Sequence, residues 1–436
     1  MTRPPRHDLV DAAVLEVEGL VREQGWLADR ALERVLRRER RLYASERRAV
    51  AETVYAILRS LGQLAWLAGA APGALDPATL YALWLARSGS ASPAEAARRL
   101  GVPAATLARA VERADERLSG IADPVDRIAA RESLPRWIAE RFVAEMGEGD
   151  AALLARAMNR RAPLTIRANT LRTTREALRA RLADEGVAAT PARFSPWGLV
   201  LDGHANAFAL RSFQEGLFEI QDEGSQLIAL AVGARPGQTV VDACAGAGGK
   251  SLALAAEMRG KGSLFALDVD GDRLDEARRR ARRAGVHNLR TRAIPAGADA
   301  AAAIEDLAGR GDRVLVDAPC AGLGTLRRKP DARWRLREGD PERFAAVQRE
   351  LVERFARLVR PRGRLVYATC SIGRTENGEV AAAVASLGAF APLPIERALG
   401  PELARALGAT GHTLQLWPHV HGTDGFFLAA FERAGP

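Results

Sequence analysis

The sequence predicts an α/β protein with a parallel β-sheet in its carboxyl-terminal part, an all-helical domain at its start and a small α+β domain between them. Three observations support this prediction. Apolar residues recur at helical spacing from about residue 8 to 120, helices mix with short strands from about 124 to 235, and strands alternate with helices from 237 onward. Such alternation is typical of a parallel sheet covered by helices. The predicted domains are residues 1–121, 122–235 and 236–436.

The composition is that of a folded protein in a reducing compartment. With 47% hydrophobic and 27% charged residues, the chain can bury large cores and does not resemble a disordered protein. Its three cysteines lie far apart and form no C-x-x-C pair, so we expect neither a disulfide framework nor a metal site. The charged amino-terminal residues 1–8 precede no apolar segment, and no apolar run reaches membrane-spanning length. We therefore expect a cytoplasmic protein without a membrane partner.

The net charge of +9 favours a polyanionic partner such as RNA, because each neutralised phosphate releases counterions. Much of the surplus arginine lies in helical stretches such as 278–283, where a solvated helix face explains it equally well. Charge alone therefore permits an RNA partner without establishing one.

The first two domains contain few residues with an obvious chemical role. Ser45 is a plausible N-cap for a helix whose apolar residues belong to the core, namely Val50, Val54, Ile57, Leu58, Leu61 and Leu64. In the middle domain we expect a helix at 134–146, a strand at 164–168, a helix at 175–185 and short strands near 187 and 199. Asn169 and Arg172 follow the first strand, where they could contact a phosphate backbone or cap the next helix.

The last domain is predicted to contain strands at 239–243, 264–269, 313–318 and 364–369, with helices at 251–258, 273–284 and 344–359. In parallel sheets of this kind, ligands bind at the carboxyl ends of the strands. We therefore expect the functional residues in the loops that follow these strands.

A glycine-rich loop, residues 242–251, follows the first of these strands and leads into a helix. Its glycines allow the backbone to approach a ligand closely at a helix N-terminus. The next strand ends at Asp268, which could accept hydrogen bonds from ribose hydroxyls of a nucleoside cofactor. These two features fit NAD and S-adenosylmethionine equally well, and the glycines could also serve helix–strand packing alone.

Two cysteines distinguish the alternatives, because Cys320 and Cys370 each follow a predicted strand at the ligand side of the sheet. A single free cysteine is most often a small buried apolar residue, but a pair beside Asp317 and a nucleoside-cofactor loop suggests chemistry. Methylation of cytosine at carbon 5 requires a reactive cysteine, because a thiolate must first add to carbon 6 to make carbon 5 nucleophilic. Asp317 could stabilise this adduct near ring atom N3.

The motifs around these residues resemble those of the RNA cytosine-5 methyltransferases of the Sun/RsmB type, over the whole chain. Residues 242–251 resemble the family's D-x-C-A-A-P-G-G-K-T loop, 317–325 its D-A-P-C-S-G-x-G-T motif and 367–371 its Y-A-T-C-S motif. Residues 221–226 and 424–427 resemble its flanking motifs. This chain has Ala247 where the family loop has proline, and Ile294 and Pro295 where the family has an acidic residue for the adenine.

The resemblance implies a Rossmann-like class I methyltransferase domain, preceded by a NusB-like RNA-binding domain and an RRM-like domain. It implies that Cys370 is the nucleophile, that Cys320 assists product release and that Asp317 lies near the methyl donor and the base. The implied S-adenosylmethionine contacts are Cys244, Ala245, Gly246, Ala247, Gly248, Gly249, Lys250, Asp268 and Asp317. Asn169 and residues 327–329 are candidate RNA contacts.

We therefore expect a monomeric enzyme that forms 5-methylcytosine, with 16S ribosomal RNA as the expected substrate because the NusB-like segment resembles that branch. Transfer RNA is an alternative substrate. Two other functions stay open at this point. A catalytically silent RNA-binding or ribosome-assembly factor would fit the basic charge, and an NAD-dependent oxidoreductase would fit the glycine loop and Asp268 but would leave both cysteines without a role.

Overall fold

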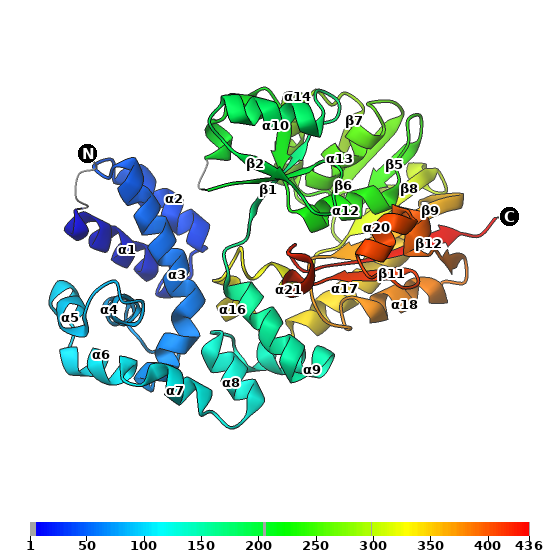
Figure 1. The fold of residues 1–436 in the computed structure, drawn as a ribbon. Helices are drawn as coiled ribbons and strands as arrows, with labels where there is room; N and C mark the ends of the chain where they lie inside the picture. The colour runs from blue at the N-terminus through cyan, green and yellow to red at the C-terminus, as the bar shows by residue number, and fades with distance from the viewer. Residues whose placement is uncertain (1–5, 204–205, 298, 436) are drawn as a thin grey trace. The chain divides into compact units, whose positions relative to one another are not determined.

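The computed structural model of the chain describes residues 6–203, 206–297 and 299–435 (Figure 1). Residues 1–5, on which the expectation of a cytoplasmic protein partly rests, lie outside the described residues. The chain divides into two compact units, one formed by Met1–Arg160 with Leu326–Glu338 and the other by Arg161–Thr325 with Gly339–Pro436. The domain boundaries predicted from the sequence, after residues 121 and 235, stay a prediction.

The first unit consists of helices. They are α1 (His7–Arg22), α2 (Ala28–Arg38), α3 (Ala44–Ala68), α4 (Pro77–Arg87), α5 (Pro93–Leu100), α6 (Ala104–Val111), α7 (Ala114–Ser119), α8 (Pro124–Arg131), α9 (Arg136–Asn159) and α16 (Ala332–Arg335). No helix among the described residues is long and apolar enough to cross a membrane.

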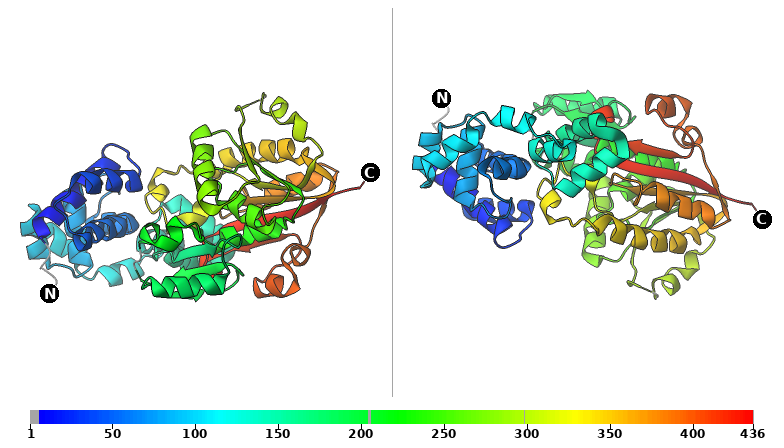
Figure 2. Two further views of the ribbon diagram at one scale, coloured as in Figure 1. Left: turned by 90° about the horizontal axis from the view of Figure 1, so that it is seen from above. Right: turned by 90° about the horizontal axis from the view of Figure 1, so that it is seen from below.

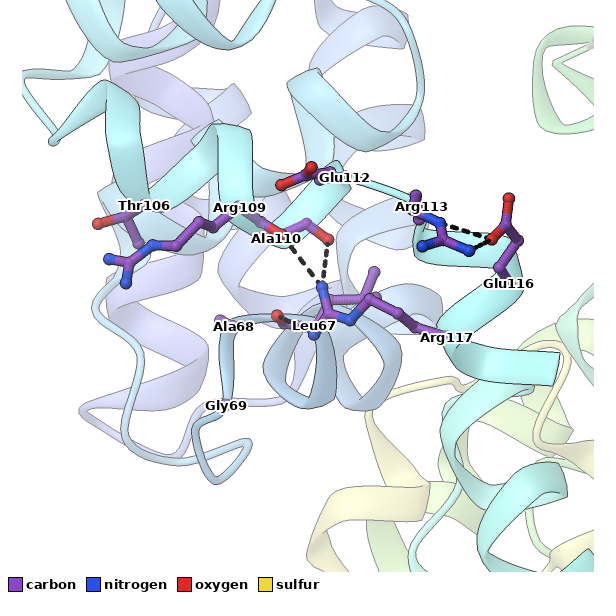
Figure 3. A pocket seen from close by; sticks show the side chains of 10 residues that line it. All are labelled: Leu67, Ala68, Gly69, Thr106, Arg109, Ala110, Glu112, Arg113, Glu116 and Arg117. Carbon is purple, nitrogen blue, oxygen red and sulfur yellow. Dashed lines mark hydrogen bonds and ion pairs between the residues drawn. The ribbon is translucent and has the colours of Figure 1, made fainter. Parts of the chain in front are cut away.

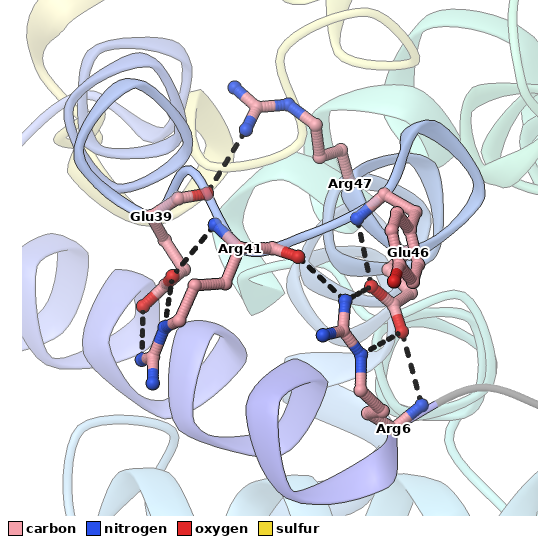
Figure 4. Close-up of polar contacts among 6 residues, drawn as sticks. Arg6, Glu39, Arg41, Glu46 and Arg47 are labelled. Atoms are coloured by element: carbon pink, nitrogen blue, oxygen red, sulfur yellow. Dashed lines mark hydrogen bonds and ion pairs between the residues drawn. The ribbon is translucent and has the colours of Figure 1, made fainter.

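Helix α3 is at the centre of this unit, and its predicted core residues are all buried, from Val50 to Leu64. The predicted N-cap, Ser45, is wrong because the chain enters the helix earlier, with Tyr43 at the N-cap position. The carboxylate of Glu46 accepts the backbone N–H of Tyr43 at 2.8 Å and pairs with Arg6 at 2.7 Å (Figure 4). A glutamate in the first turn thus satisfies a helix-end donor in place of a serine.

Residues 326–338 belong to the carboxyl-terminal half of the sequence but pack into this helical unit. The guanidinium of Arg333 is fully buried and donates to the carbonyl of Ser133 at 3.0 Å and to Oδ1 of Asn159 at 2.7 Å. The ring of Trp334 packs where Gly62 has no side chain, since a Cβ there would lie 2.7 Å from the ring. These contacts explain why the segment belongs to the first unit.

The second unit begins with a four-stranded antiparallel sheet in the order β2-β3-β1-β4. Its elements are β1 (Leu164–Ala168), α10 (Arg175–Asp184), β2 (Ala189–Pro191), β3 (Gly198–Leu201), η1 (Ala207–Ala209), α11 (Arg211–Gln214) and β4 (Phe218–Ile220). Ile166, Leu178 and Phe218 are fully buried in its core. This arrangement agrees with the predicted small α+β piece.

The rest of the second unit is built on an eight-stranded sheet in the order β10-β12-β9-β8-β5-β6-β7, with β11 beside β12. The strands are β5 (Thr239–Asp242), β6 (Ser263–Asp268), β7 (Leu289–Ala293), β8 (Gly311–Asp317), β9 (Val359–Thr369), β10 (Phe390–Pro392), β11 (Thr413–Leu416) and β12 (Phe426–Arg433). The strands from β9 to β7 along this order are parallel, whereas β12 runs antiparallel to β9, β10 and β11.

Helices pack on both faces of this sheet (Figure 2). The helices of this part of the unit are α12 (Glu223–Val232), α13 (Gly249–Glu257), α14 (Gly271–Ala284), α15 (Asp299–Ala302), η2 (Glu305–Leu307), η3 (Leu323–Thr325), α17 (Asp340–Ala356), α18 (Gly378–Ser386), α19 (Ile395–Leu399), α20 (Pro401–Ala406) and α21 (Pro418–His421).

The alternation of side chains along each strand fills two cores, so that Val240 and Val241 of β5 belong to opposite ones. The predicted Rossmann-like fold is thereby confirmed. The carboxyl ends of β5, β6, β8 and β9 meet at one edge of the sheet, where the predicted catalytic and cofactor-binding residues lie.

Candidate active site

The loop after β5 turns sharply into α13 because two of its glycines adopt left-handed backbone angles, with φ of +52° at Gly246 and +78° at Gly248. A Cβ at Gly248 would lie 2.9 Å from the Cβ of Ala277 in α14, so only glycine fits this close approach. Gly248 is also the N-cap of α13, and no side chain among the described residues caps that end. The first N–H groups of the helix are thus available to a ligand at this position.

Asp242, at the end of β5, is buried and only half satisfied. Its Oδ2 accepts the hydroxyl of Ser251 at 2.6 Å, whereas Oδ1 has no hydrogen-bond partner among the described residues. Burial raises the pKa of Asp242 to about 7. A buried carboxyl oxygen without a partner is costly, which fits a site completed by a polar ligand. A nucleoside cofactor in the adjoining loop would supply such a ligand.

Asp268, at the end of β6, supports the glycine loop directly. One carboxylate oxygen accepts the N–H of Gly246 at 2.6 Å and the other accepts the N–H of Asp270 at 2.9 Å. Each oxygen retains a second lone pair for a hydroxyl donor. Its predicted role toward the ribose stays a prediction. Ile294, at the adenine position of the family, is buried, and its N–H bonds to the carbonyl of Asp268.

Lys250 and Asp317 form an ion pair, with 2.6 Å between Nζ and Oδ2. Lys250 is in the first turn of α13, and Asp317 is the last residue of β8. Burial alone would lower the pKa of Lys250, but the negative charge of Asp317 overrides it and raises that pKa. The ammonium also lies 5.5 Å from the ring centre of Phe426 in β12.

The two predicted cysteines meet beside this pair: the Sγ atoms of Cys320 and Cys370 are 3.3 Å apart. The hydrogen bond between the thiols lowers the pKa of Cys370, with a further contribution from the positive charge of Lys250. The same hydrogen bond and burial raise the pKa of Cys320. The arrangement therefore favours a thiolate at Cys370 that accepts a hydrogen bond from a neutral thiol at Cys320.

A residue that the sequence prediction did not single out joins the two cysteine loops. The carboxylate of Glu376, buried in the loop after β9, accepts the N–H of Ala321 at 2.8 Å and the hydroxyl of Ser371 at 2.5 Å. Glu376 follows Cys370 by six positions and is not at a strand end. In the sequence, the available signal for a role of Glu376 is its acidic side chain close to a cysteine motif.

The other predicted residues do not join this cluster. Cys244 packs against the core beneath the loop, and burial raises the pKa of its thiol well above its ordinary value. Asn169 is buried, and its amide donates to the carbonyls of Gly216 and Ala284, each at 2.8 Å, which leaves no amide proton for a phosphate. In the helical unit, Arg327 is buried and Lys329 is exposed.

A cavity of about 670 Å³ lies in the helical unit between the end of α3 and helices α6 and α7 (Figure 3). Arginines line it, and two of them are held by the protein: Arg117 donates to the carbonyls of Arg109 and Ala110, and Arg113 pairs with Glu116. We assign no chemistry to this cavity.

Comparison with known proteins decides the family. Residues 229–432 match the family described as 16S rRNA methyltransferase RsmB/F, and residues 134–207 match an RsmF/B-like ferredoxin-like domain. A probable ribosomal RNA small subunit methyltransferase B of Synechocystis is 30% identical over 93% of this chain and 95% of its own length. The chain belongs to the RsmB/F family.

Other relatives agree with this assignment. A probable ribosomal RNA small subunit methyltransferase B of Bacillus subtilis is 35% identical over 72% of this chain and 70% of its own length. The crystal structure of PH0851 is 27% identical, covers 99% of this chain and 100% of its own, and has a TM-score of 0.78. As an RsmB/F member, the chain is an S-adenosylmethionine-dependent RNA methyltransferase and not an NAD-dependent oxidoreductase.

Proposed function

We propose that this RsmB/F member methylates carbon 5 of a cytosine in 16S ribosomal RNA through a covalent adduct with Cys370. One observation supports this most: two thiols lie 3.3 Å apart at the carboxyl ends of adjacent strands, and their pKa values are shifted in opposite directions. One thiol is thereby suited to attack, and the other stays protonated beside it.

Four side chains of this protein take part in the proposed reaction. The thiolate of Cys370 adds to carbon 6 of the cytosine, which makes carbon 5 electron-rich. The adduct takes up a proton from water at N3, where the negative charge brought by the thiolate accumulates. Asp317, held by Lys250 at 2.6 Å, accepts a hydrogen bond from that N3–H and stabilises the adduct. Cys320 assists the last step, in which a base takes the carbon 5 proton and the carbon 5–carbon 6 double bond re-forms. As it does so, the bond between carbon 6 and sulfur breaks to regenerate the thiolate of Cys370, and N3 returns its proton to water.

The cofactor would be held by the loop of residues 244–250, by Asp242 through its unpartnered oxygen and by Asp268. When bound, S-adenosylmethionine supplies an electrophilic sulfonium methyl group. The N-terminus of α13 and the close approach permitted by Gly248 place backbone N–H groups toward it.

Ribosomal RNA is proposed as the substrate because the relatives are named as methyltransferases of the small ribosomal subunit, and transfer RNA is the alternative. The net charge of +9 supports a polyanionic substrate. With such a substrate the enzyme would act in the cytoplasm, and we propose that it does so as a monomer.

Bisulfite sequencing tests the proposal, because 5-methylcytosine resists the conversion of cytosine to uracil. Unmodified 16S ribosomal RNA and transfer RNA are incubated with the protein and S-adenosylmethionine, with Cys370→Ser as the control. We expect protected cytosines in the ribosomal RNA with the wild-type protein alone. Protection confined to transfer RNA would overturn the substrate. No protection in either RNA, with the cofactor bound, would favour a catalytically silent RNA-binding factor.

A further inference from the structure

Glu376 contacts both cysteine loops at the same position of each. Ala321 directly follows Cys320, and Ser371 directly follows Cys370; the first donates its N–H to Oε1 of Glu376 and the second its hydroxyl to Oε2. The glutamate is 1% exposed. One carboxylate thus bridges two loops whose cysteines are 50 positions apart in the sequence.

Neighbouring side chains hold this bridge in place. The amide of Gln348, in α17, donates to Oε1 of Glu376 at 3.1 Å and to the carbonyl of Pro319 at 2.9 Å. The residues before and after Cys320 are therefore both tied to the same pair of side chains. A buried carboxylate is costly unless its lone pairs are used, and here they serve the two loops.

The loop of Cys370 is fixed in the same way by the next residue. The amide oxygen of Asn377 accepts the hydroxyl of Thr369 at 2.6 Å, and its amide nitrogen donates to the carbonyl of Ser371 at 3.2 Å. Both neighbours of Cys370 are thus held by the dipeptide of Glu376 and Asn377, whose glutamate also reaches the loop of Cys320.

We propose that Glu376 is a positioning residue that sets the separation of the two thiols. This inference rests on the proposed function, in which Cys370 and Cys320 act in turn on the same base. A thiol that must act beside an existing carbon–sulfur bond has to stay within contact distance of the first sulfur, and small displacements of reacting groups reduce rates strongly. Strand β8 ends at Asp317, three residues before Cys320, so the strand by itself does not place this thiol.

The separation of the thiols is measured without RNA by oxidation with diamide. Diamide takes two electrons and the two thiol protons, becomes the corresponding hydrazine, and leaves a bond between the two Sγ atoms. Mass spectrometry follows the loss of two hydrogens in wild type, Glu376→Ala, Glu376→Gln and the matched control Glu379→Ala. Glu379 lies in the first turn of α18, is exposed and pairs with Arg349 at 3.3 Å.

We expect Glu376→Ala to slow disulfide formation by about tenfold or more, because both bridging hydrogen bonds are lost. Glu376→Gln is expected to stay within about threefold of wild type, because its amide can accept from Ala321 and donate to Ser371. Glu379→Ala is expected to match wild type. An unchanged rate in Glu376→Ala, or a loss in Glu376→Gln as large as that in Glu376→Ala, would overturn the proposal.

Turnover on RNA provides the second readout. Glu376→Ala should accumulate covalent protein–RNA adduct, as expected for an enzyme whose second thiol is displaced, while its affinity for S-adenosylmethionine stays unchanged. In a Cys320→Ala background the same substitution should have little further effect on turnover, because no second thiol remains to be placed. An equal loss in both backgrounds would contradict a role through the thiol pair.

If Glu376→Ala does not fold, Ser371→Ala removes one half of the bridge and should slow oxidation by a few fold. The two proposals fail separately. Slow oxidation in Glu376→Ala together with no 5-methylcytosine from wild type would keep the positioning role and refute the proposed function. Normal methylation by wild type, together with an unchanged oxidation rate in the variants, would keep the proposed function and refute the positioning role of Glu376.

Discussion

Nζ of Lys250 lies 2.6 Å from Oδ2 of Asp317, and its positive charge adds to the hydrogen bond from Cys320 in lowering the pKa of Cys370. The glycine loop therefore has an effect besides its proposed contact with the cofactor. Lys250, on the first turn of α13, places a positive charge at the strand ends where the thiols lie. The glycine loop and the thiol of Cys370 are thus electrostatically coupled through the side chain of Lys250.

Lys250→Met should make Cys370 less reactive at neutral pH. Without the ammonium, the negative charge of Asp317 is left uncompensated, and both changes raise the pKa of Cys370. The pH midpoint for alkylation of Cys370 by iodoacetamide should move upward, and a midpoint higher by about one pH unit should slow alkylation at pH 7 by about tenfold. Lys261→Met, at an exposed lysine, is the control. A midpoint that does not move would show that Lys250 does not activate the thiol.

Arg280→Met should weaken binding of S-adenosylmethionine although the residue is outside the glycine loop. Its Nη1 donates to the carbonyl of Ala247 at 2.8 Å, and Glu219 in β4 holds the guanidinium at 2.9 Å. Loss of one charged hydrogen bond to the loop should raise the dissociation constant by about tenfold. The neighbouring Arg279→Met removes an exposed arginine paired with Glu276 and should bind normally in calorimetry. Equal affinities for both variants would contradict support of the loop by Arg280.

Glu18→Met should stabilise the helical unit at neutral pH. Glu18 is buried in α1, neither carboxyl oxygen has a hydrogen-bond partner among the described residues, and burial raises its pKa to about 8. Between about pH 4.5 and pH 8 the unfolded chain releases a proton that the native state retains, so native stability falls as the pH rises. At pH 7 this costs about 3 kcal/mol of unfolding free energy.

Denaturation at pH 5 and pH 7 measures this effect. The gain in unfolding free energy from Glu18→Met should be larger at pH 7 than at pH 5. Glu23→Gln, at an exposed position, should leave the unfolding free energy unchanged at both pH values. A gain that is the same at both pH values would mean that Glu18 does not titrate in this range.

The sequence predicts the elements whose own residues determine them. The strand expected at 164–168 has those bounds in the structure, because its apolar residues alternate and polar residues follow. The strand β7 was not predicted, since Leu289–Ala293 carries two arginines and little apolar character and is placed by its pairing with β6. The sequence indicates only a flanking motif at residues 424–427 and not the strand Phe426–Arg433, because a strand buried on both faces has no alternation to reveal it.

In the candidate site, too, the sequence predicts what its own local residues determine. The meeting of Cys320 and Cys370 could be predicted, because both follow parallel strands that turn out to be neighbours in the sheet. Glu376 could not, because it lies in an irregular loop whose course depends on contacts with Gln348 and with the loop of Cys320. Likewise, nothing in the sequence reveals that the amide of Asn169 is used by two carbonyls from distant segments.

In the proposed mechanism, Cys370 attacks the base and Cys320 releases it. The most direct measurement is a denaturing gel of the protein incubated with unmodified 16S ribosomal RNA and S-adenosylmethionine, comparing Cys320→Ala, Cys370→Ser and the double variant. A protein–RNA adduct should accumulate with Cys320→Ala and be absent from both variants that lack the Cys370 thiol. An adduct that accumulates with Cys370→Ser and disappears with Cys320→Ala would contradict the assignment.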